Sequence, residues 1–406
     1  MNSKRSTAHG EKLKVLIAGG GIGGMAAAAA LLQRDFEVEV YEQAGEMREV
    51  GAGIQISPNG NRALDSLGVF ASLQGKACNA QSKEIRLWNT GKTWPLFSLG
   101  DAAVRQYGYP YLTIFRPDLL GALSAQVERL QPGAIRLGVR VEQVSQDTSG
   151  TSLILSDGSE VHGDVLIGAD GIHSKVRSAL FGPAGVEFSG MVAWRALIPI
   201  EQLPERFHRS VAANWVGPGG HVVHYPVQGG RLMNFVGTLE GNVWEGPPWN
   251  AQGTKEACLD AFVGWHEDIL TMIRAAPEVR KWALCTTPLL KNWSIDRITL
   301  LGDACHATLP FLAQGAVHAI EDGVVLARVL ADSADIPGAL RRYDAARRPR
   351  ANRMVLGAAE NRSRFHHPDL ANEQSADEFI SREWQSNAIN ERYSWLFDYD
   401  AQTAGV

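Results

Sequence analysis

The chain has 406 residues, more than one hydrophobic core usually supports, so two packed domains are expected. It is 45% hydrophobic and 20% charged, a balance that suits a folded α/β protein and excludes a disordered chain. A formal net charge of −5 gives no electrostatic reason to expect nucleic acid or an anionic membrane as a partner.

The N-terminus and the cysteines indicate the compartment. Residues 1–14 are polar and lack the apolar stretch of a signal peptide, so we expect a loose tail on a cytoplasmic protein. The cysteines are widely scattered without metal-ligand spacing, which predicts reduced thiols and no metal site. They are Cys78, Cys258, Cys285 and Cys305.

The first predicted elements form a βαβ unit. Lys14–Ala18 is expected to be a buried parallel strand, Met25–Gln33 an alanine-rich helix and Val38–Tyr41 a second strand. Their combined length of roughly 30 residues is typical of a βαβ unit.

A glycine motif joins the first strand to the helix. Gly19 permits a tight turn, Gly21 lets a diphosphate approach the backbone, and Gly24 allows close packing of helix on strand. The helix N-terminus then favours the anion. Glu42 ends the second strand, where an acidic residue binds ribose hydroxyls. Because the glycines lie between a predicted strand and a predicted helix, and an acid ends the next strand, the motif predicts dinucleotide binding.

Two further buried strands, Asp164–Ile167 and Ile298–Leu301, run directly into Gly/Asp turns. The first turn carries Asp170 and Gly171, and the second carries Asp303. A carboxylate at the end of a parallel strand can accept hydrogen bonds from sugar or ribityl hydroxyls, although Asp and Gly are also ordinary turn residues. Three pieces of one nucleotide-binding sheet are therefore expected far apart in the sequence.

Residues 188–241 differ in character from the parallel strands. Their β-rich runs alternate with glycine turns, which predicts an antiparallel sheet in a second domain inserted into the first. Strand alternation places His221, Val223 and Tyr225 on one face and His224 on the other. His221 and Tyr225 can then bind or deprotonate a phenolic hydroxyl, although packing is the commoner role for such a pair.

Other polar residues have less specific roles. Arg195 can bind a substrate carboxylate through two hydrogen bonds, although a structural role is commoner for such an arginine. His306 is expected to belong to the Asp303 turn. His366 and His367 are expected in a solvated loop.

The C-terminal residues are polar overall but rich in aromatic rings, which predicts a tail that packs on the body. These rings include Trp384, Tyr393, Trp395, Phe397 and Tyr399.

In this order, the three Gly/Asp motifs resemble those of the group A (single-component) FAD-dependent aromatic hydroxylases. In that family they are the dinucleotide fingerprint, the DG motif and the GD motif. The resemblance covers nearly the whole chain, from about Lys14 to Tyr399. It implies an α/β fold, in which an inserted, mostly antiparallel β-sheet substrate domain interrupts a Rossmann-type FAD-binding domain.

The expected division of the chain follows from this arrangement. Residues 1–75, 105–185 and 285–370 are expected to form the FAD-binding domain, residues 76–104 and 186–284 the substrate domain, and residues 371–406 a tail that packs on the body.

More segments carry the resemblance. Val50–Asn59, which contains Gln55, resembles the family loop near the flavin ring. Arg116 matches the FAD-contacting arginine of the family motif His-Arg-x-Asp-Leu, although Phe115 replaces the histidine and is left unassigned. Leu309–Ala316 resembles the segment that lies against the flavin.

A helix is predicted after that segment, over Gly315–Leu330. The resemblance implies that Pro310, Gly315 and Ala316 contact the cofactor. The dipole of the helix N-terminus can stabilise negative charge on the N1/C2 edge of a reduced flavin, whereas a plain amphipathic helix is the alternative interpretation.

The resemblance also implies the chemistry. NADH or NADPH binds transiently and reduces FAD, and O2 then hydroxylates a small aromatic substrate through a flavin C4a-hydroperoxide. The chain has no second nicotinamide fingerprint, and a homodimer is left open. Close relatives that act on hydroxybenzoates and hydroxynicotinate share the His-x-x-x-Tyr pattern, which favours His221 and Tyr225 as substrate contacts.

The exact substrate stays open among three types of relative: salicylate 1-hydroxylase, 3-hydroxybenzoate 6-hydroxylase and 6-hydroxynicotinate 3-monooxygenase. Gln55 matches the 3-hydroxybenzoate type, whereas Pro310 matches the other two. By a narrow margin, we expect a salicylate-like acid that loses its carboxylate. A flavin reductase or oxidase without oxygen transfer and a non-catalytic dinucleotide-binding protein are the alternatives.

Overall fold

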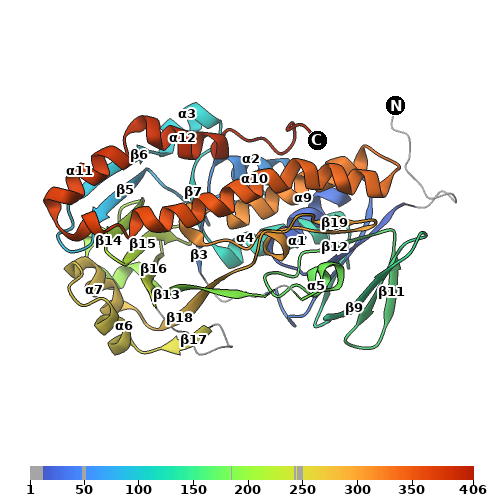
Figure 1. Cartoon of the computed structure of the whole chain (residues 1–406), viewed down its shortest axis with the longest axis horizontal. Helices are drawn as coiled ribbons and strands as arrows, with labels where there is room; N and C mark the ends of the chain where they lie inside the picture. The colour runs from blue at the N-terminus through green and yellow to red at the C-terminus, as the bar shows by residue number, and fades with distance from the viewer. Residues whose placement is uncertain (1–11, 48–51, 184, 242–243, 245–249) are drawn as a thin grey trace.

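The computed structural model describes residues 12–47, 52–183, 185–241, 244 and 250–406. Residues 1–11 of the expected N-terminal tail lie outside the described residues, as do Val50 and Gly51 of the segment that resembles the flavin loop. Two large sheets organise the described chain, and the long helix α10 (Ile336–Phe365) runs past both of them (Figure 1).

The first large sheet has six strands and contains all of the predicted parallel strands. In spatial order they are β19 (Ser294–Ile295), β20 (Ile298–Leu300), β12 (Val165–Gly168), β1 (Lys14–Ala18), β2 (Glu37–Glu42) and β8 (Ile135–Leu137). All pairings are parallel except β19 with β20. Val15, Leu16 and Ile17 are fully buried, as expected for a parallel strand covered on both faces. The three distant sequence segments are therefore neighbours in one sheet, as predicted.

Helix α1 (Ile22–Leu32) packs tightly on helix α9 (Gly315–Ala331). The run Ala26–Ala30 is fully buried because alanine leaves room for a neighbouring backbone. A Cβ atom on Gly323 of α9 would lie only 2.6 Å from the backbone nitrogen of Ala27, so glycine is required there. The N-termini of both helices, at Gly21 and Gly315, line one cavity with the Gly/Asp turns.

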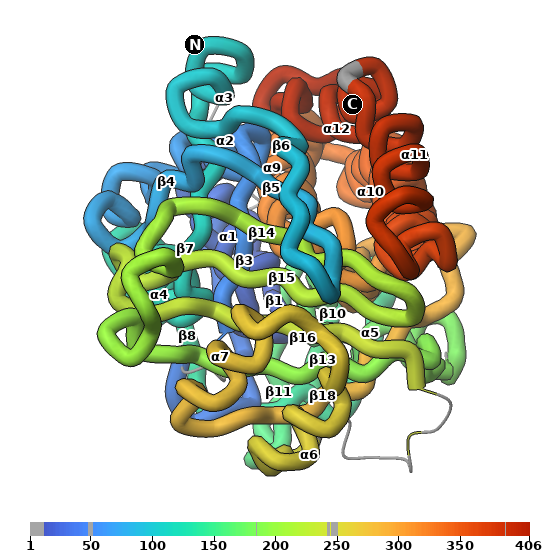
Figure 2. Tube along the Cα trace, turned by 90° about the vertical axis from the view of Figure 1, so that its left-hand side faces the viewer, coloured from blue at the N-terminus to red at the C-terminus, as the bar shows by residue number. Residues whose placement is uncertain are grey.

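The second large sheet has eight strands. They are β17 (Asn250–Gly253), β18 (Val279–Thr286), β13 (Glu187–Pro199), β16 (Leu232–Glu240), β15 (Gly220–Val227), β14 (Val211–Gly217), β5 (Ser82–Leu87) and β6 (Thr93–Ser98). Neighbouring strands pair antiparallel in the described part of this sheet, except β14 with β5, which are parallel. Figure 2 shows this sheet broadside, with helices α6 (Lys255–Ala261) and α7 (Glu267–Ala275) in front of it.

Two three-stranded sheets complete the β structure. One contains β11 (Glu160–Gly163), β10 (Thr151–Leu155) and β9 (Val141–Gln146), and the other contains β3 (Gly53–Ile56), β7 (Leu112–Phe115) and β4 (Cys78–Asn79). The second contacts the eight-stranded sheet, because the backbone N–H of Gly53 donates to Oδ1 of Asn234 on β16. A Cβ atom on Gly53 would lie 2.7 Å from the ring of Tyr225, so glycine permits this close approach.

The remaining helices connect these layers. They are α2 (Pro58–Ser66), α3 (Gly100–Tyr107), α4 (Arg116–Leu130), α5 (Lys175–Phe181), α8 (Asp303–His306), α11 (Glu373–Glu383), α12 (Ser386–Phe397) and the 3-10 helices η1 (Phe70–Leu73), η2 (Ile200–Gln202), η3 (Glu205–Phe207), η4 (Pro310–Leu312) and η5 (Pro368–Ala371). Among the described residues, no helix combines the length and the apolar character needed to cross a membrane.

The C-terminal residues fold as α11 and α12 and pack on the body. Trp384, Tyr393 and Phe397 are buried in one cluster with residues of β5, β6 and η4. The rings of Tyr393 and Phe397 both lie within 7 Å of the Phe97 ring on β6, at 5.6 and 6.4 Å. This burial explains the density of rings in an otherwise polar segment.

Candidate active site

A cavity of about 750 Å³ lies where the two large sheets meet. Its walls bring together nearly all residues that the sequence singled out. These are Gly19, Gly21, Glu42, Gln55, Arg116, Asp170, Gly171, Arg195, His221, Tyr225, Asp303, Pro310, Gly315 and Ala316. A cavity that is shared by two sheets and combines apolar walls with a few polar groups is typical of a cofactor and substrate site.

The glycine motif has the geometry that a diphosphate needs. Gly19 has φ +106°, and a Cβ atom there would lie 2.3 Å from the carbonyl oxygen of Ala169. Gly24 is not on the cavity wall, because it packs against the Gly19 backbone, where a Cβ atom would lie 2.0 Å from the carbonyl oxygen. Beside Gly21 the space is open at the N-terminus of α1, so a diphosphate fits there.

Glu42 lies at the same end of the cavity and is fixed by the backbone. Its Oε2 accepts a hydrogen bond from the N–H of Gly20 at 2.7 Å, and its Oε1 accepts one from Ala44 at 2.8 Å. A carboxylate has further lone pairs, so it can also accept from a ribose hydroxyl. Glu42 therefore orders the glycine turn in addition to its predicted contact with the cofactor.

Glu42→Ala is expected to weaken FAD retention, because it removes the ribose acceptor and frees two N–H groups in the turn. We expect the purified variant to lose most of its flavin absorbance on dialysis, with a stability loss of roughly 1–3 kcal/mol from the unpaired donors. Glu37→Ala, an exposed position on the same strand, is the control and is expected to retain FAD. Full flavin retention in Glu42→Ala would contradict the assigned role.

The two Asp turns are tied to each other. The carboxylate of Asp170 accepts from the backbone N–H of Lys175 at 2.7 Å, so it caps α5 while lining the cavity. Burial raises the pKa of Asp170, although its hydrogen bonds oppose this shift. Arg177 donates to the carbonyls of Ile172 and Ala304, one in each turn. The side chain of Asp303 is exposed at the cavity wall.

The segment before α9 is anchored by buried amides. Gln314 donates from Nε2 to Oγ of Ser57 at 2.8 Å. Asn59 donates from Nδ2 to Oε1 of Glu321 at 2.7 Å, within α9. These bonds place the N-terminus of α9, at Gly315, on the cavity wall, where its dipole can face an anionic flavin edge.

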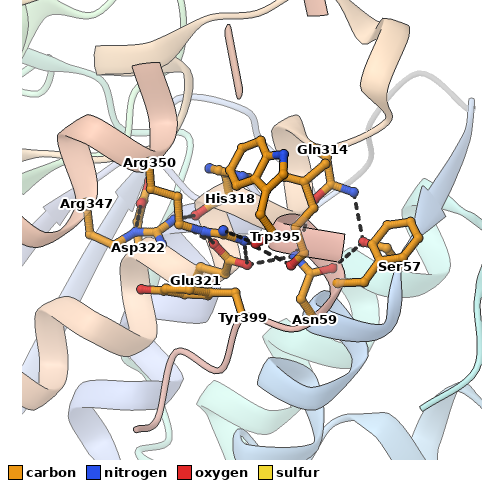
Figure 3. Close-up of polar contacts among 12 residues, drawn as sticks. Ser57, Asn59, Gln314, His318, Glu321, Asp322, Arg347, Arg350, Trp395 and Tyr399 are labelled. Carbon is orange, nitrogen blue, oxygen red and sulfur yellow. Dashed lines mark hydrogen bonds and ion pairs between the residues drawn. The ribbon is translucent and has the colours of Figure 1, made fainter. Parts of the chain in front are cut away.

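Behind this segment lies a buried ionic network that the sequence reasoning missed (Figure 3). Arg347 pairs with Glu321 and Asp322, both at 2.8 Å, and all three side chains are fully buried. Arg350 donates to both carboxylate oxygens of Glu321 at 3.0 Å. His306 does not line the cavity, because its Nε2 contacts Asp322 at 2.6 Å. Glu321 and Asp322 are adjacent acids in α9, and Arg347 and Arg350 form an Arg-x-x-Arg pattern in α10. This combination is the sequence signal that could have indicated the network.

The C-terminal residues contribute to the same network. Arg350 donates to the backbone carbonyls of Trp395 and Leu396 at the end of α12. Its guanidinium group also lies 3.8 Å from the ring centroid of Tyr399, a cation–π contact. Through Arg350, the end of the chain is thereby connected to α9, the helix that starts at Gly315 on the cavity wall.

The strand β15 presents the alternation that the sequence predicts. His221, Val223 and Tyr225 line the cavity. His224 points to the other face, where its ring packs near Phe207 at 6.2 Å between centroids. Burial lowers the pKa of His224 to about 3, so it is neutral.

The prediction for His366 was wrong. It is 7% exposed, and its Nε2 lies 2.7 Å from Nδ1 of His221. His367 is 37% exposed and stacks on the Phe379 ring at 4.2 Å. The long helix α10 ends at Phe365 and places His366 against β15. Local sequence pattern does not reveal this contact, because the two segments are far apart in the chain.

Lys83 on β5 is a cavity residue that the sequence reasoning did not single out. It is 6% exposed, and its ammonium group has neither a hydrogen bond nor an ion pair within the described residues. Its ammonium group lies 5.8 Å from the ring centroid of Tyr111. Burial lowers the pKa of Lys83 to about 8. A lysine in a predicted strand is ordinarily assigned to the solvent-facing side. Only the structure shows that Lys83 faces the cavity instead.

Arg195 lies on the wall of the same cavity. Its guanidinium carbon is 5.4 Å from the ring centroid of Trp282. Burial lowers the pKa of Arg195, and its Nε has no hydrogen-bond partner among the described residues. Lys83 and Arg195 are therefore two buried cations on the cavity wall that suit an anionic ligand.

Comparison with known proteins agrees with this geometry. The family described as FAD binding domain matches residues 12–358. A 3-amino-4-hydroxybenzoate 2-monooxygenase of Streptomyces platensis is 36% identical over 393 residues, which cover 97% of each chain. A 3-hydroxybenzoate 6-hydroxylase of Polaromonas naphthalenivorans is 34% identical and covers 96% of each chain. A 6-hydroxynicotinate 3-monooxygenase of Pseudomonas fluorescens is 34% identical and covers 86% of this chain and 91% of its own.

Solved structures show the same architecture. A variant of HpxO from Klebsiella pneumoniae with bound FAD has a TM-score of 0.80 at 26% identity, covering 93% of this chain and 97% of its own. A substrate complex of salicylate hydroxylase has a TM-score of 0.79 at 25% identity, covering 96% of each chain. The predicted fold class and FAD cofactor are thus confirmed. The chain belongs to the family of FAD-dependent aromatic monooxygenases.

Proposed function

We propose that this chain hydroxylates a small phenolic aromatic acid, with FAD, O2 and NADH or NADPH. The observation that carries the proposal is the shared cavity, whose wall includes the dinucleotide motifs as well as His221, Tyr225 and Lys83. A flavin held by the motifs would lie beside a ring bound by the other three residues.

The cavity residues fit FAD in a definite way. The glycine turn and the α1 N-terminus would hold the diphosphate, Glu42 the adenosine ribose, and the Pro310–Ala316 segment the flavin ring. When bound and reduced, FAD would activate O2 for transfer of one oxygen atom to the substrate ring. The protein binds and orients the ring, excludes water and controls protons.

His221 and Tyr225 would divide the proton chemistry between them. Burial, with His366 nearby, holds the pKa of His221 well below its ordinary value, so the ring is a neutral proton acceptor. Burial raises the pKa of Tyr225, against the opposing effects of Arg195 and Gln55, so its hydroxyl stays protonated. We therefore propose His221 as the base for the substrate hydroxyl and Tyr225 as a hydrogen-bond donor.

Lys83 supports an acid as the substrate. A buried ammonium without an anionic partner is unfavourable, and a bound carboxylate would relieve that cost. Arg195 offers a second site for the same group. An aromatic acid thus fits the cavity better than a neutral phenol does.

Lys83→Met is expected to raise the KM for aromatic acids roughly 10- to 100-fold, because a hydrogen bond to a charged group contributes about 1.5–3 kcal/mol. A carboxylate binds the protonated lysine, so wild-type affinity falls as pH rises above the pKa of about 8. The variant lacks this pH dependence. Steady-state kinetics from pH 6 to 10 measure both effects, with a phenol that lacks a carboxylate as the control. An unchanged KM for the acids would remove Lys83 from the carboxylate site.

The choice among individual aromatic acids depends on Pro310 and on the named relatives, which favour different positions of attack. Pro310 favours a salicylate-like acid, in which attack at the carboxylate-bearing carbon gives catechol and CO2. The relatives named 3-amino-4-hydroxybenzoate 2-monooxygenase and 3-hydroxybenzoate 6-hydroxylase favour attack at an open ring carbon, which keeps the carboxylate.

A product screen tests the proposal. Salicylate, 3-hydroxybenzoate, 6-hydroxynicotinate and 3-amino-4-hydroxybenzoate are each incubated with enzyme and NADH or NADPH, and hydroxylated product, peroxide and CO2 are measured. Product identity decides, because a non-substrate can stimulate NADH oxidation and yield only peroxide. Gentisate without CO2 would overturn the salicylate preference alone. No hydroxylated product from any phenolic, aminated or heteroaromatic ring would overturn the proposed function.

A further inference from the structure

His221 is the inner end of a chain of contacts that leads from the cavity to the surface. Its Nδ1 lies 2.7 Å from Nε2 of His366, and Nδ1 of His366 lies 3.1 Å from Oε1 of Glu240. His221 and His366 are 2% and 7% exposed, whereas the side chain of Glu240 is 44% exposed. Two buried rings therefore connect the cavity to a carboxylate in contact with solvent.

Packing holds these groups in line. The rings of Phe311 and Phe365 lie 4.8 and 5.3 Å from the His221 ring, between centroids. At the outer end, Nε of Arg362 lies 3.2 Å from Oε1 of Glu240, and its Nη1 donates to the Ser189 carbonyl. These contacts keep the His221 ring and the Glu240 carboxylate in place beside His366.

The direction of each hydrogen bond follows from the carboxylate. Burial raises the pKa of Glu240, but hydrogen bonds from His366 and Arg362 lower it overall, so the group is ionised and accepts only. Nδ1 of His366 must then donate. Burial lowers the pKa of His366, so its ring is neutral and its Nε2 accepts from Nδ1 of His221. The unprotonated nitrogen of His221 is therefore Nε2, the one that His366 does not bond.

We propose that His221, His366 and Glu240 form a proton relay between the substrate hydroxyl and solvent. The relay rests on the proposed function, in which a phenolic hydroxyl lies against His221. Nε2 of His221 takes the hydroxyl proton while its Nδ1 proton passes to Nε2 of His366. The Nδ1 proton of His366 passes to Glu240, which releases a proton to water.

The proton balance closes. Every N–H or O–H bond that breaks is matched by one that forms, and the net change is a phenolate in the cavity and one proton in solvent. The same steps in reverse return a proton to the product oxygen and restore both histidine tautomers. The buried site thus exchanges a proton with water without opening.

The other charged or titratable groups near the path act at its ends. Lys83, Arg195, Arg116 and Tyr225 share the cavity wall with His221. The three cations there favour the phenolate electrostatically. Within the described part of the chain, Glu240 is the one carboxylate with a hydrogen bond or ion pair to either relay ring.

The test measures proton release without turnover. FAD-bound enzyme, with no reductant, is mixed rapidly with salicylate, 3-hydroxybenzoate or 6-hydroxynicotinate in turn, in a weakly buffered solution with a pH indicator. Phenolate absorbance and proton release are followed together. Glu240→Gln keeps an oxygen that accepts from His366 but takes no proton, and His366→Gln interrupts the path. We expect both variants to slow proton release roughly 100-fold, the scale of a lost acid–base group.

Controls separate the relay from a structural role. Glu360→Gln removes another exposed carboxylate, which pairs with Arg364 on α10, and is expected to release protons at the wild-type rate. Formate is expected to restore release in Glu240→Ala by accepting the proton. FAD content and melting temperature identify a folding defect, and if His366→Gln fails to fold, Glu240→Gln alone decides. Wild-type release in the folded variants would overturn the relay, whereas absence of hydroxylated product from wild-type enzyme would instead overturn the proposed function.

Discussion

Replacing His221 by alanine is expected to lower the rate of hydroxylation roughly 10²- to 10⁴-fold, the range for loss of a general base. An aromatic ring accepts electrophilic oxygen far better as a phenolate than as a phenol, so the proton must leave before oxygen transfer. Burial and the adjacent His366 hold the pKa of His221 well below its ordinary value, so the ring is unprotonated throughout pH 6–8 and has a free nitrogen for the hydroxyl proton. The rate of product formation in single turnover measures the loss, and the product formed per NADH or NADPH oxidised reports the coupling.

Two variants on the same strand are the controls. Tyr225→Phe removes a hydrogen-bond donor but no base, so a loss of roughly 1–3 kcal/mol in substrate binding is expected. His224→Ala changes a neutral histidine on the opposite face, away from the cavity, and is expected to lower stability more than rate. If His224→Ala slows hydroxylation as much as His221→Ala, His221 is not the base.

Local sequence pattern predicts the nucleotide-binding half of the site well. The tight turn at Gly19 and the close packing at Gly24 follow from steric rules that act over a few residues. The alternation of β15 likewise separates His221 from His224, because neighbouring side chains on a strand point to opposite faces. These features need no knowledge of distant contacts.

Residues whose role depends on distant contacts escaped the sequence reasoning. His366 contacts His221, which is 145 residues earlier in the sequence. Because of this contact, His366 is buried, although a solvated loop was expected there. Lys83 lies in a strand that joins the eight-stranded sheet through parallel pairing with β14, which directs it into the cavity. Burial of a charge is decided by these long-range pairings, so composition and periodicity do not indicate it.

The domain boundaries and the catalytic roles stay predictions. Residues 82–98 join the same sheet as residues 187–286, which supports the assignment of both segments to one substrate domain. Because Asn234 and Tyr225 of that sheet touch Gly53, the two halves of the site are in direct contact. A substrate ring and a flavin could therefore be positioned by the same short strand.

Replacing Arg347 by methionine is expected to destabilise the chain by roughly 3–5 kcal/mol, the cost of leaving buried charges without their partner. Arg347 pairs with Glu321 and Asp322, and all three side chains are 0% exposed. Burial by itself raises the pKa of Glu321, but Arg350 and Arg347 lower it to about 2. Methionine fills similar space but supplies no charge, so both carboxylates would lose a cation. Urea unfolding at pH 7 measures the loss.

The pH dependence separates the lost ion pairs from lost packing. In the wild type, the lowered pKa of Glu321 gives stability that is fully present above its unfolded value near 4.5 and is lost as pH falls through about 2. In Arg347→Met, Glu321 keeps Arg350 and Asp322 keeps His306, but each carboxylate has lost one cation. The pKa of each carboxylate therefore rises, and protonation relieves part of the cost. The stability gap between the two proteins is therefore expected to narrow as pH falls below about 5. Arg341→Met, at a 69% exposed position on the same helix, is the control, with an expected change of roughly 0–1 kcal/mol. A gap that stays constant from pH 7 to pH 3 would attribute the loss to packing, because packing does not depend on the protonation of Glu321 and Asp322.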